Sequence, residues 1–195
     1  MKKSFFISLM IVLFSAPSFA YEKGEIVAKF GFAHVKPNGD GALDGALDVE
    51  SDTQIGLTLT YMLSDNLGLG LLAATPFSHD ITVSGDKVGE VSHLPPTFTL
   101  QYHFNNSSDI KPYVGAGLNY TIFFEEESVL GDLALDSSVG LALEAGVDFA
   151  IHQNWGVNVS VWNIDIDSDA ELDGAELDTV EIDPWVFMIG AAYTF

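Results

Sequence analysis

The chain has 195 residues, 48% of them hydrophobic and 18% charged, with no cysteine, and all 7 basic residues are lysines. Beyond Lys2 and Lys3, five lysines stand against 28 acidic residues, a net charge of −23 that excludes nucleic-acid binding. The apolar content excludes a disordered acidic chain, and the lack of cysteine excludes a disulfide framework and any thiolate site.

Residues 1–20 have the pattern of a secretory signal peptide. Lys2 and Lys3 form a positive n-region, residues 5–14 (FFISLMIVLF) an apolar h-region, and residues 18–20 (SFA) a small-x-small cleavage site. The apolar run is shorter than the roughly 20 residues that a membrane-spanning helix needs. We therefore expect an exported protein with a single domain over residues 21–195, which enters a membrane, if it does so, without helices.

Beyond Gly24 the residues alternate with a period of two, which is typical of β-strands. The predicted strands are 24–35, 52–63, 67–75, 97–104, 111–124, 138–151, 155–166 and 181–195. Their even number predicts an all-β fold, an eight-stranded antiparallel up-and-down transmembrane β-barrel.

The connections between these strands alternate in length. Those at 64–66, 105–110 and 152–154 are short, whereas four others, 36–51, 76–93, 125–137 and 167–180, are long and polar. Tight turns at one rim and long extracellular loops at the other are typical of outer-membrane barrels.

The two faces of the predicted strands differ in chemistry. In the second strand Leu57 and Leu59 alternate with Thr58 and Thr60, and across the chain the polar face consists mostly of Gly, Thr, Ser, Gln and Asn. A water-facing exterior would need many charged side chains. The apolar face has no charge along its centre and ends in aromatics such as Tyr61, as a lipid-facing surface does. We therefore predict that the apolar face points outward.

Acidic residues gather in the long loops, which hold or adjoin 22 of the 28. They either keep the rim solvated or hold divalent cations that screen lipopolysaccharide. The spacing of acidic residues in 165–176 matches a calcium loop in part, but Ala170 replaces the glycine that its sharp turn needs, so no metal site is predicted.

Five sequence blocks resemble the outer membrane protein W (OmpW) family, and together they cover nearly the whole mature chain. The blocks are GLLAATPFSHDI (70–81), HLPPTFTLQYHF (93–104), KPYVGAGLNYTIFF (111–124), NVSVWNIDID (158–167) and DPWVFMIGAAYTF (183–195). Two features depart from the family. The loops are more acidic than is expected of it, and Gly70 occupies a lumen-facing position that would suit a carboxylate. The resemblance implies a narrow, largely apolar channel associated with the uptake of small hydrophobic molecules. It also implies a constriction formed by Leu72 and Trp162.

Eight strands enclose a space that side chains nearly fill, so no open aqueous pore is expected. Four large apolar residues nevertheless fall on the lumen face: Leu72, Trp162, Val186 and Met188. They either pack together as a plug or line a pocket for an apolar ligand, which gains free energy by leaving water. The family resemblance favours the pocket.

Three prolines, Pro76, Pro95 and Pro96, fall where the third and fourth strands reach the long-loop rim. Each removes one donor from the strand ladder, and unpaired strand edges are costly in lipid. Our interpretation is a lateral gap through which a ligand reaches the bilayer, and the alternative is ordinary strand termination.

Four charged residues, Glu25, Lys29, Glu144 and Asp148, fall on the lumen face within strands. We predict an ion-pair cluster that seals the periplasmic half of the barrel, with a proton or ion path as the alternative.

No enzyme is expected, because the five histidines are dispersed and no catalytic motif is present. A barrel-rim hydrolase is the alternative, in which His34, His79 or His93 would act together with a loop Ser or Asp. The expected partners are small hydrophobic molecules, outer-membrane lipid and lipopolysaccharide, the expected state is monomeric, and no cofactor is predicted. The alternative function is a structural or adhesive barrel with a plugged lumen and acidic cation-binding loops.

Overall fold

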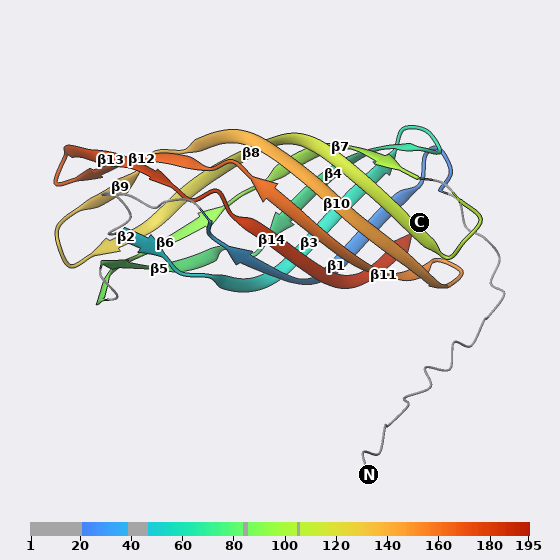
Figure 1. The fold of residues 1–195 in the computed structure, drawn as a ribbon, viewed down its shortest axis with the longest axis horizontal. Helices are drawn as coiled ribbons and strands as arrows, with labels where there is room; N and C mark the ends of the chain where they lie inside the picture. Colours follow the sequence, from blue (N-terminus) through green and yellow to red (C-terminus); the bar gives the residue numbers. More distant parts are fainter. Residues whose placement is uncertain (1–20, 39–46, 84–85, 105) are drawn as a thin grey trace, which may run out of the picture.

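The computed structural model describes residues 21–38, 47–83, 86–104 and 106–195, so the predicted signal peptide (1–20) lies outside the described residues. The described chain forms an elongated β-barrel with the C-terminus at the end where the strand connections are short (Figure 1). Within these residues, no helix has the length and apolar character needed to cross a membrane.

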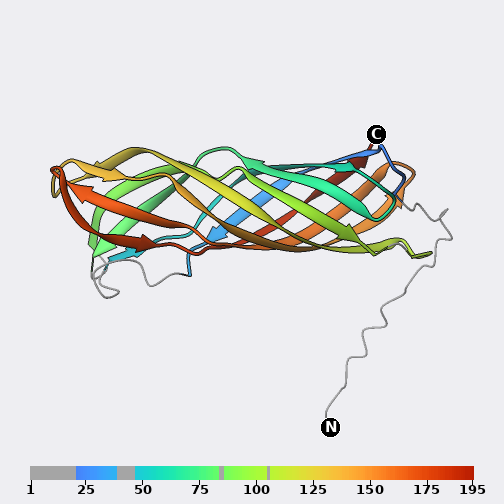
Figure 2. The same cartoon turned by 90° about the horizontal axis from the view of Figure 1, so that it is seen from above.

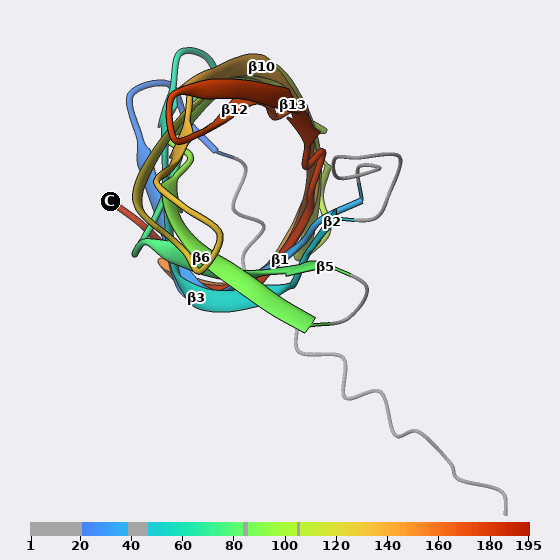
Figure 3. The ribbon, with the colours of Figure 1, turned by 90° about the vertical axis from the view of Figure 1, so that its left-hand side faces the viewer.

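Eight antiparallel strands close the barrel, which confirms the predicted fold. They are β1 (Ile26–Lys36), β3 (Asp52–Met62), β4 (Leu67–Ala74), β7 (Thr97–His103), β8 (Ile110–Ser128), β10 (Ser138–His152), β11 (Trp155–Ile164) and β14 (Trp185–Thr194). Each strand pairs with its neighbours in this order, and the ring closes where β14 pairs with β1. The closed ring is visible along the barrel axis (Figure 3).

The side chains on these strands face as the alternation predicts. The side chains of Phe32 and Leu141 are 66% and 65% exposed on the outside, whereas Val27 and Lys29 are buried inside. At the short-turn end, outward rings contact one another edge to face, as Trp155 does with Tyr193 at 4.8 Å between centroids. An apolar outer band with an aromatic border matches a lipid-facing surface.

The long connections differ from the loops expected, because most of their described residues form further strands. These are β2 (Leu47–Val49), β5 (Phe77–Val83), β6 (Asp86–Leu94), β9 (Leu133–Leu135), β12 (Asp167–Leu172) and β13 (Ala175–Glu181). They continue the barrel wall at the end opposite the C-terminus (Figures 1 and 2). The physical reason is a short alternation within the acidic segments: Ala170 is buried, while Asp169 and Glu171 beside it are exposed.

The outer extension, by which we mean these six strands, stands beyond the lipid-facing band. The outward side chains of β5 and β6 are polar, and Ser78 bonds Ser92 while Lys87 pairs with Asp80 and Glu90. Such side chains are suited to water and not to hydrocarbon. The barrel therefore has a membrane-spanning part and a water-exposed part in series.

Candidate functional site

Part of the lumen wall is apolar in the half nearer the outer extension, and it faces a buried polar strip in which Asn119 bonds Thr97 and Thr121. Leu72 on β4, Trp162 on β11, and Val186 and Met188 on β14 all point inward and are buried. Trp162 lies opposite Val186 in the ladder between their strands. All four belong to one continuous apolar cluster, which extends outward through Ile182. We call this cluster the apolar column.

A cavity of about 180 Å³ lies inside the outer extension, and we call it the vestibule. Its lining is almost entirely aliphatic and includes Val83, Val91, Leu133, Leu135, Leu172 and Val180. It exceeds an engineered apolar cavity of about 150 Å³ that admits benzene. Val91 and Val180 also belong to the apolar column, so the two regions are continuous.

Sequence reasoning assigned none of the vestibule residues to a site. Their segments are dominated by acidic residues, so they resemble solvated loops in composition. The signal that could have found them is the period-two placement of Ala170, Leu172, Val180 and Ile182 between acidic neighbours.

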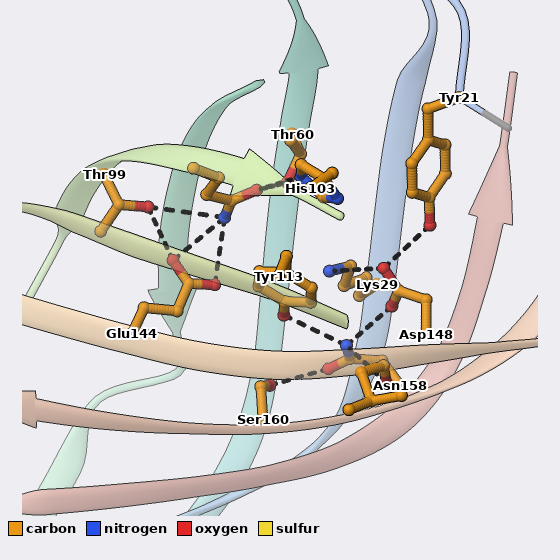
Figure 4. Close-up of polar contacts among 12 residues, drawn as sticks. Tyr21, Lys29, Thr60, Thr99, His103, Tyr113, Glu144, Asp148, Asn158 and Ser160 are labelled. Atoms are coloured by element: carbon orange, nitrogen blue, oxygen red, sulfur yellow. Dashed lines mark hydrogen bonds and ion pairs between the residues drawn. The ribbon is translucent and has the colours of Figure 1, made fainter. Parts of the chain in front are cut away.

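The opposite half of the lumen is filled by a polar network, which we call the floor (Figure 4). Lys29 Nζ lies 3.3 Å from Asp148 Oδ2 and 3.9 Å from the centre of the Tyr113 ring. The hydroxyl of Tyr21 donates to Asp148 Oδ2 at 2.8 Å, and the amide of Asn158 donates to Asp148 Oδ1 at 2.7 Å. Both oxygens of this buried carboxylate are therefore bonded.

Glu144 has its own set of donors within the floor. Thr99 Oγ1 donates to Glu144 Oε2 at 2.8 Å, and Gln101 Nε2 lies 3.0 Å from both carboxylate oxygens. Gln101 also accepts a hydrogen bond from Thr60 at 3.1 Å. Each buried carboxylate therefore has its own donors, as buried charge requires, while Lys29 is held by its ion pair with Asp148 and has no hydrogen-bond partner among the described residues.

The fourth member of the predicted ion cluster, Glu25, lies apart from the others. It is only half-buried, and its Oε2 accepts a hydrogen bond from the Glu22 amide at 2.8 Å. Glu25 directly precedes the first residue of β1, at the end of the barrel wall, where its carbonyl still accepts a hydrogen bond from the Met62 amide at 2.9 Å. The structure thus brings together Lys29, Glu144 and Asp148 without Glu25.

Glycines leave room for the large rings and amides of the floor. A Cβ atom added at Gly146 would lie 2.4 Å from the Tyr113 ring, and one at Gly70 would lie 2.4 Å from Gln101 Nε2. Gly70 is thus a position where the Gln101 side chain occupies the space that a larger residue would need. Tyr113 and Gln101, which the sequence analysis did not single out, fill the floor because these glycines face them.

The three prolines adjoin a break in the strand ladder. The β4–β7 ladder ends at Leu72 and Thr97, and the β5–β6 ladder starts at Phe77 and His93. Among the described residues, no ladder pair joins 73–76 to 94–96. On its other side this segment stays attached to β8, since the Tyr120 amide donates to the Pro96 carbonyl at 3.0 Å. Pro95 is buried, Pro96 is half-buried and Pro76 is exposed.

A stack of four rings faces the lumen beside this break. His79 and His93 bond each other through Nε2 at 2.9 Å, and His79 Nδ1 is bonded to the Glu50 carbonyl. Phe77 and Phe123 stack on His93 at 5.6 and 5.8 Å between centroids. Burial lowers the pKa of His93 to about 3, and it also lowers the pKa of His79. Both histidines therefore stay neutral near pH 7, and His93 Nδ1 is buried without a hydrogen-bond partner among the described residues.

The acidic segment 165–176 does not form a calcium loop, since most of it folds into the β12–β13 hairpin. The carboxylates of Asp165, Asp167 and Asp183 lie within 4.8 Å of one another. Burial and then the charges of Asp183 and Asp165 raise the pKa of Asp167. Exposed acidic groups commonly gather in this way without binding a metal.

Comparisons with known proteins agree with this geometry. The model of the OmpW family matches residues 22–195. Outer membrane protein W of Escherichia coli is 48% identical over 200 residues, covering 94% of each chain. The crystal structure of the outer membrane protein OprG from Pseudomonas aeruginosa has a TM-score of 0.80 at 38% identity, covering 90% of this chain and 98% of that one. The structure of outer membrane protein AlkL in DMPC lipid bilayers has a TM-score of 0.71 at 26% identity, covering 95% and 97%.

Proposed function

The chain belongs to the OmpW family of the outer membrane, and from this premise we propose that it conducts small hydrophobic molecules from the vestibule down the apolar column and sideways into the bilayer. The observation that carries the proposal is that one lumen holds a continuous apolar column toward the outer extension and a hydrogen-bonded polar floor at the other end. Each part of the route rests on a separate feature.

The vestibule and the apolar column supply the driving force for entering the barrel. A molecule that leaves water for an aliphatic surface gains about 25 cal/mol for each Å² of apolar area buried. The walls of the vestibule are almost entirely aliphatic, and they are continuous with Leu72 and Trp162 through one cluster. A small apolar molecule can therefore keep contact with apolar side chains from the vestibule to Leu72.

The floor opposes passage straight through the barrel. To cross it, an apolar molecule would have to part Lys29 from Asp148 and remove the donors of Glu144. Leaving one buried charge without its partner costs about 3–5 kcal/mol, and an apolar molecule offers no replacement bond. The unpaired stretch between 73–76 and 94–96, by contrast, interrupts the wall at the level of Leu72. Leaving through the side of the barrel therefore costs less free energy than crossing the floor.

The test of lateral exit is to restore ladder donors at the prolines. We expect the triple variant Pro76→Thr, Pro95→Thr, Pro96→Thr to slow the entry of an apolar fluorescent dye into cells that carry the protein, because paired backbone closes the gap. Dye entry is compared with a strain lacking the protein, and folding is checked by heat-modifiable migration on a gel. The matched control is Pro112→Thr, on β8 away from the break. A folded triple variant with unchanged entry would rule out the lateral exit.

A second candidate is a structural or adhesive barrel with a plugged lumen and acidic cation-binding loops. The observation in its favour is that the four lumen residues pack in one cluster, as a plug would. Leu72→Asp separates the two functions, because a carboxylate at the constriction repels apolar molecules. A conduit would lose dye entry while the barrel stays folded, whereas a structural barrel would be unaffected.

Three further points complete the proposal. The protein works as a monomer, and residues 1–20 are removed on export. It performs no catalysis: His79 and His93 bond each other, and His34 bonds the Thr53 hydroxyl on the outer surface, so these histidines do not form a nucleophile–base pair in the lumen. Mass spectrometry of the protein from outer membranes, with cross-linking in the same membranes, tests the first two points.

A further inference from the structure

The outer extension combines an apolar cavity with a strongly acidic surround. Residues 163–183, which supply one wall of the vestibule, contain nine acidic residues and no basic residue. Asp178 lines the cavity itself, between the apolar positions Leu177 and Val180. A molecule in the vestibule therefore contacts aliphatic side chains with carboxylates nearby.

Positive charge is scarce at this end of the barrel. Across 36–52, 76–93, 125–137 and 163–183, two lysines stand against 22 acidic residues. One of them, Lys87, is already paired with Asp80 and Glu90 at 2.6 and 2.8 Å. The other, Lys36, is the last residue of β1, and it does not line the vestibule. An incoming anion thus meets no unengaged cation among the lining residues.

We propose that the vestibule selects by charge, admitting neutral or cationic apolar molecules and rejecting apolar molecules that carry a carboxylate. This inference rests on the proposed conduit and names the class of substrate that it takes. Two physical effects act in the same direction on an anion, whereas for a cation the attraction of the same carboxylates offsets the loss of hydration. The carboxylate of a fatty acid would lose its hydration against walls that are aliphatic except for Ser128 and Asp178, and it would be repelled by Asp178 and the other carboxylates of 163–183.

The two effects respond differently to salt. The Debye length is about 8 Å at 0.15 M ionic strength, so added salt weakens the repulsion from carboxylates at the mouth. The loss of hydration inside the cavity does not depend on ionic strength. The affinity for the neutral molecule relative to the anion should therefore decrease at high salt, but it should stay above one.

The test uses three ligands with eight carbon atoms each: octanol, octylammonium and octanoate. Their binding to the purified full-length mature protein in zwitterionic lipid nanodiscs is measured at pH 8, at low and at high salt. Partitioning into protein-free nanodiscs is subtracted. We expect octanol and octylammonium to bind at least tenfold more tightly than octanoate, and this ratio to narrow at high salt.

A charge reversal locates the effect. Asp178→Lys, within the cavity wall, should reduce the ratio of octanol affinity to octanoate affinity at least threefold. The control Asp109→Lys, on a short turn at the opposite end, should leave this ratio unchanged. Equal binding of all three ligands by the unmodified protein, or tighter binding of octanoate, would overturn the charge filter and leave the conduit standing. If none of the three binds, the conduit itself is refuted and the filter with it.

Discussion

Lys29 is the buried charge whose removal should disturb the floor most. Its side chain is 1% exposed, that of Asp148 is 4% exposed, and their charged atoms lie 3.3 Å apart. In Lys29→Met the carboxylate keeps its bonds from Tyr21 and Asn158 but loses its counter-charge. Breaking a buried pair on one side costs about 3–5 kcal/mol. We therefore expect the free energy of unfolding to fall by that amount.

The assay is urea-induced unfolding of the barrel in phospholipid vesicles, followed by heat-modifiable migration and tryptophan fluorescence. The double variant Lys29→Met, Asp148→Asn removes both charges, so it should recover most of the loss. Lys111→Met is the matched control, because Lys111 is buried near a turn and its Nζ donates to the Asn106 carbonyl at 2.8 Å. This control should cost about 1.5–3 kcal/mol, the range for a hydrogen bond that involves a charged group.

The reasoning about the floor is refuted if Lys29→Met is as stable as the unmodified protein. It is also refuted if the double variant is no more stable than the single one, because the loss would then come from packing and not from an unpaired charge. The reasoning is refuted as well if the double variant recovers less free energy of unfolding than Lys111→Met loses.

Three more predictions follow from the described contacts. Trp162→Ala should lower the free energy of unfolding by about 3–5 kcal/mol and admit bulkier dyes, measured by urea titration and dye entry. The pKa of His93 is lowered to about 3 in the folded state, so the unfolded chain binds a proton at higher pH than the folded chain does. The contribution of His93 to the free energy of unfolding is therefore full above about pH 6.5 and declines as the pH falls toward 3. Hydrogen exchange of β5 and β6 should accelerate over that range, and His93→Phe should reduce this acceleration. Gly146→Ala should cost about 1–3 kcal/mol, since its Cβ would lie 2.4 Å from the Tyr113 ring, and an unchanged urea midpoint would contradict that contact.

The membrane-spanning part of the barrel could be predicted from sequence because lipid and lumen impose opposite demands on alternate residues. A slip of one residue would move Lys29 into lipid and Phe30 into the lumen, so the pattern fixes both the strands and their faces. The same logic placed Leu72 and Trp162 inside. The face assignment needed only the contrast between the charge-free outer stripe and the Gly- and Thr-rich inner one.

The outer extension was harder to predict because water covers its outside. Asp169 and Glu171 are outward residues of β12, and the apolar residues between them are too few and too small to stand out in an acidic segment. The vestibule depends on contacts between β5, β6, β12 and β13, which are far apart in sequence. Glu25 was grouped with the floor for a related reason: alternation cannot tell where a strand ends, and Glu25 bonds the Glu22 amide at the end of β1.

The most direct measurement of the central claim is a map of where an apolar molecule touches the protein on its way through. A photoreactive alkane bearing a diazirine is added to outer-membrane vesicles, irradiated, and its adducts are located by mass spectrometry. The account predicts adducts on vestibule residues, on Leu72 or Trp162, and around Pro95 and Pro96, with none on the floor. Adducts at Lys29, Gln101 or Asp148 would contradict it, because they would place the molecule on a path straight through the barrel.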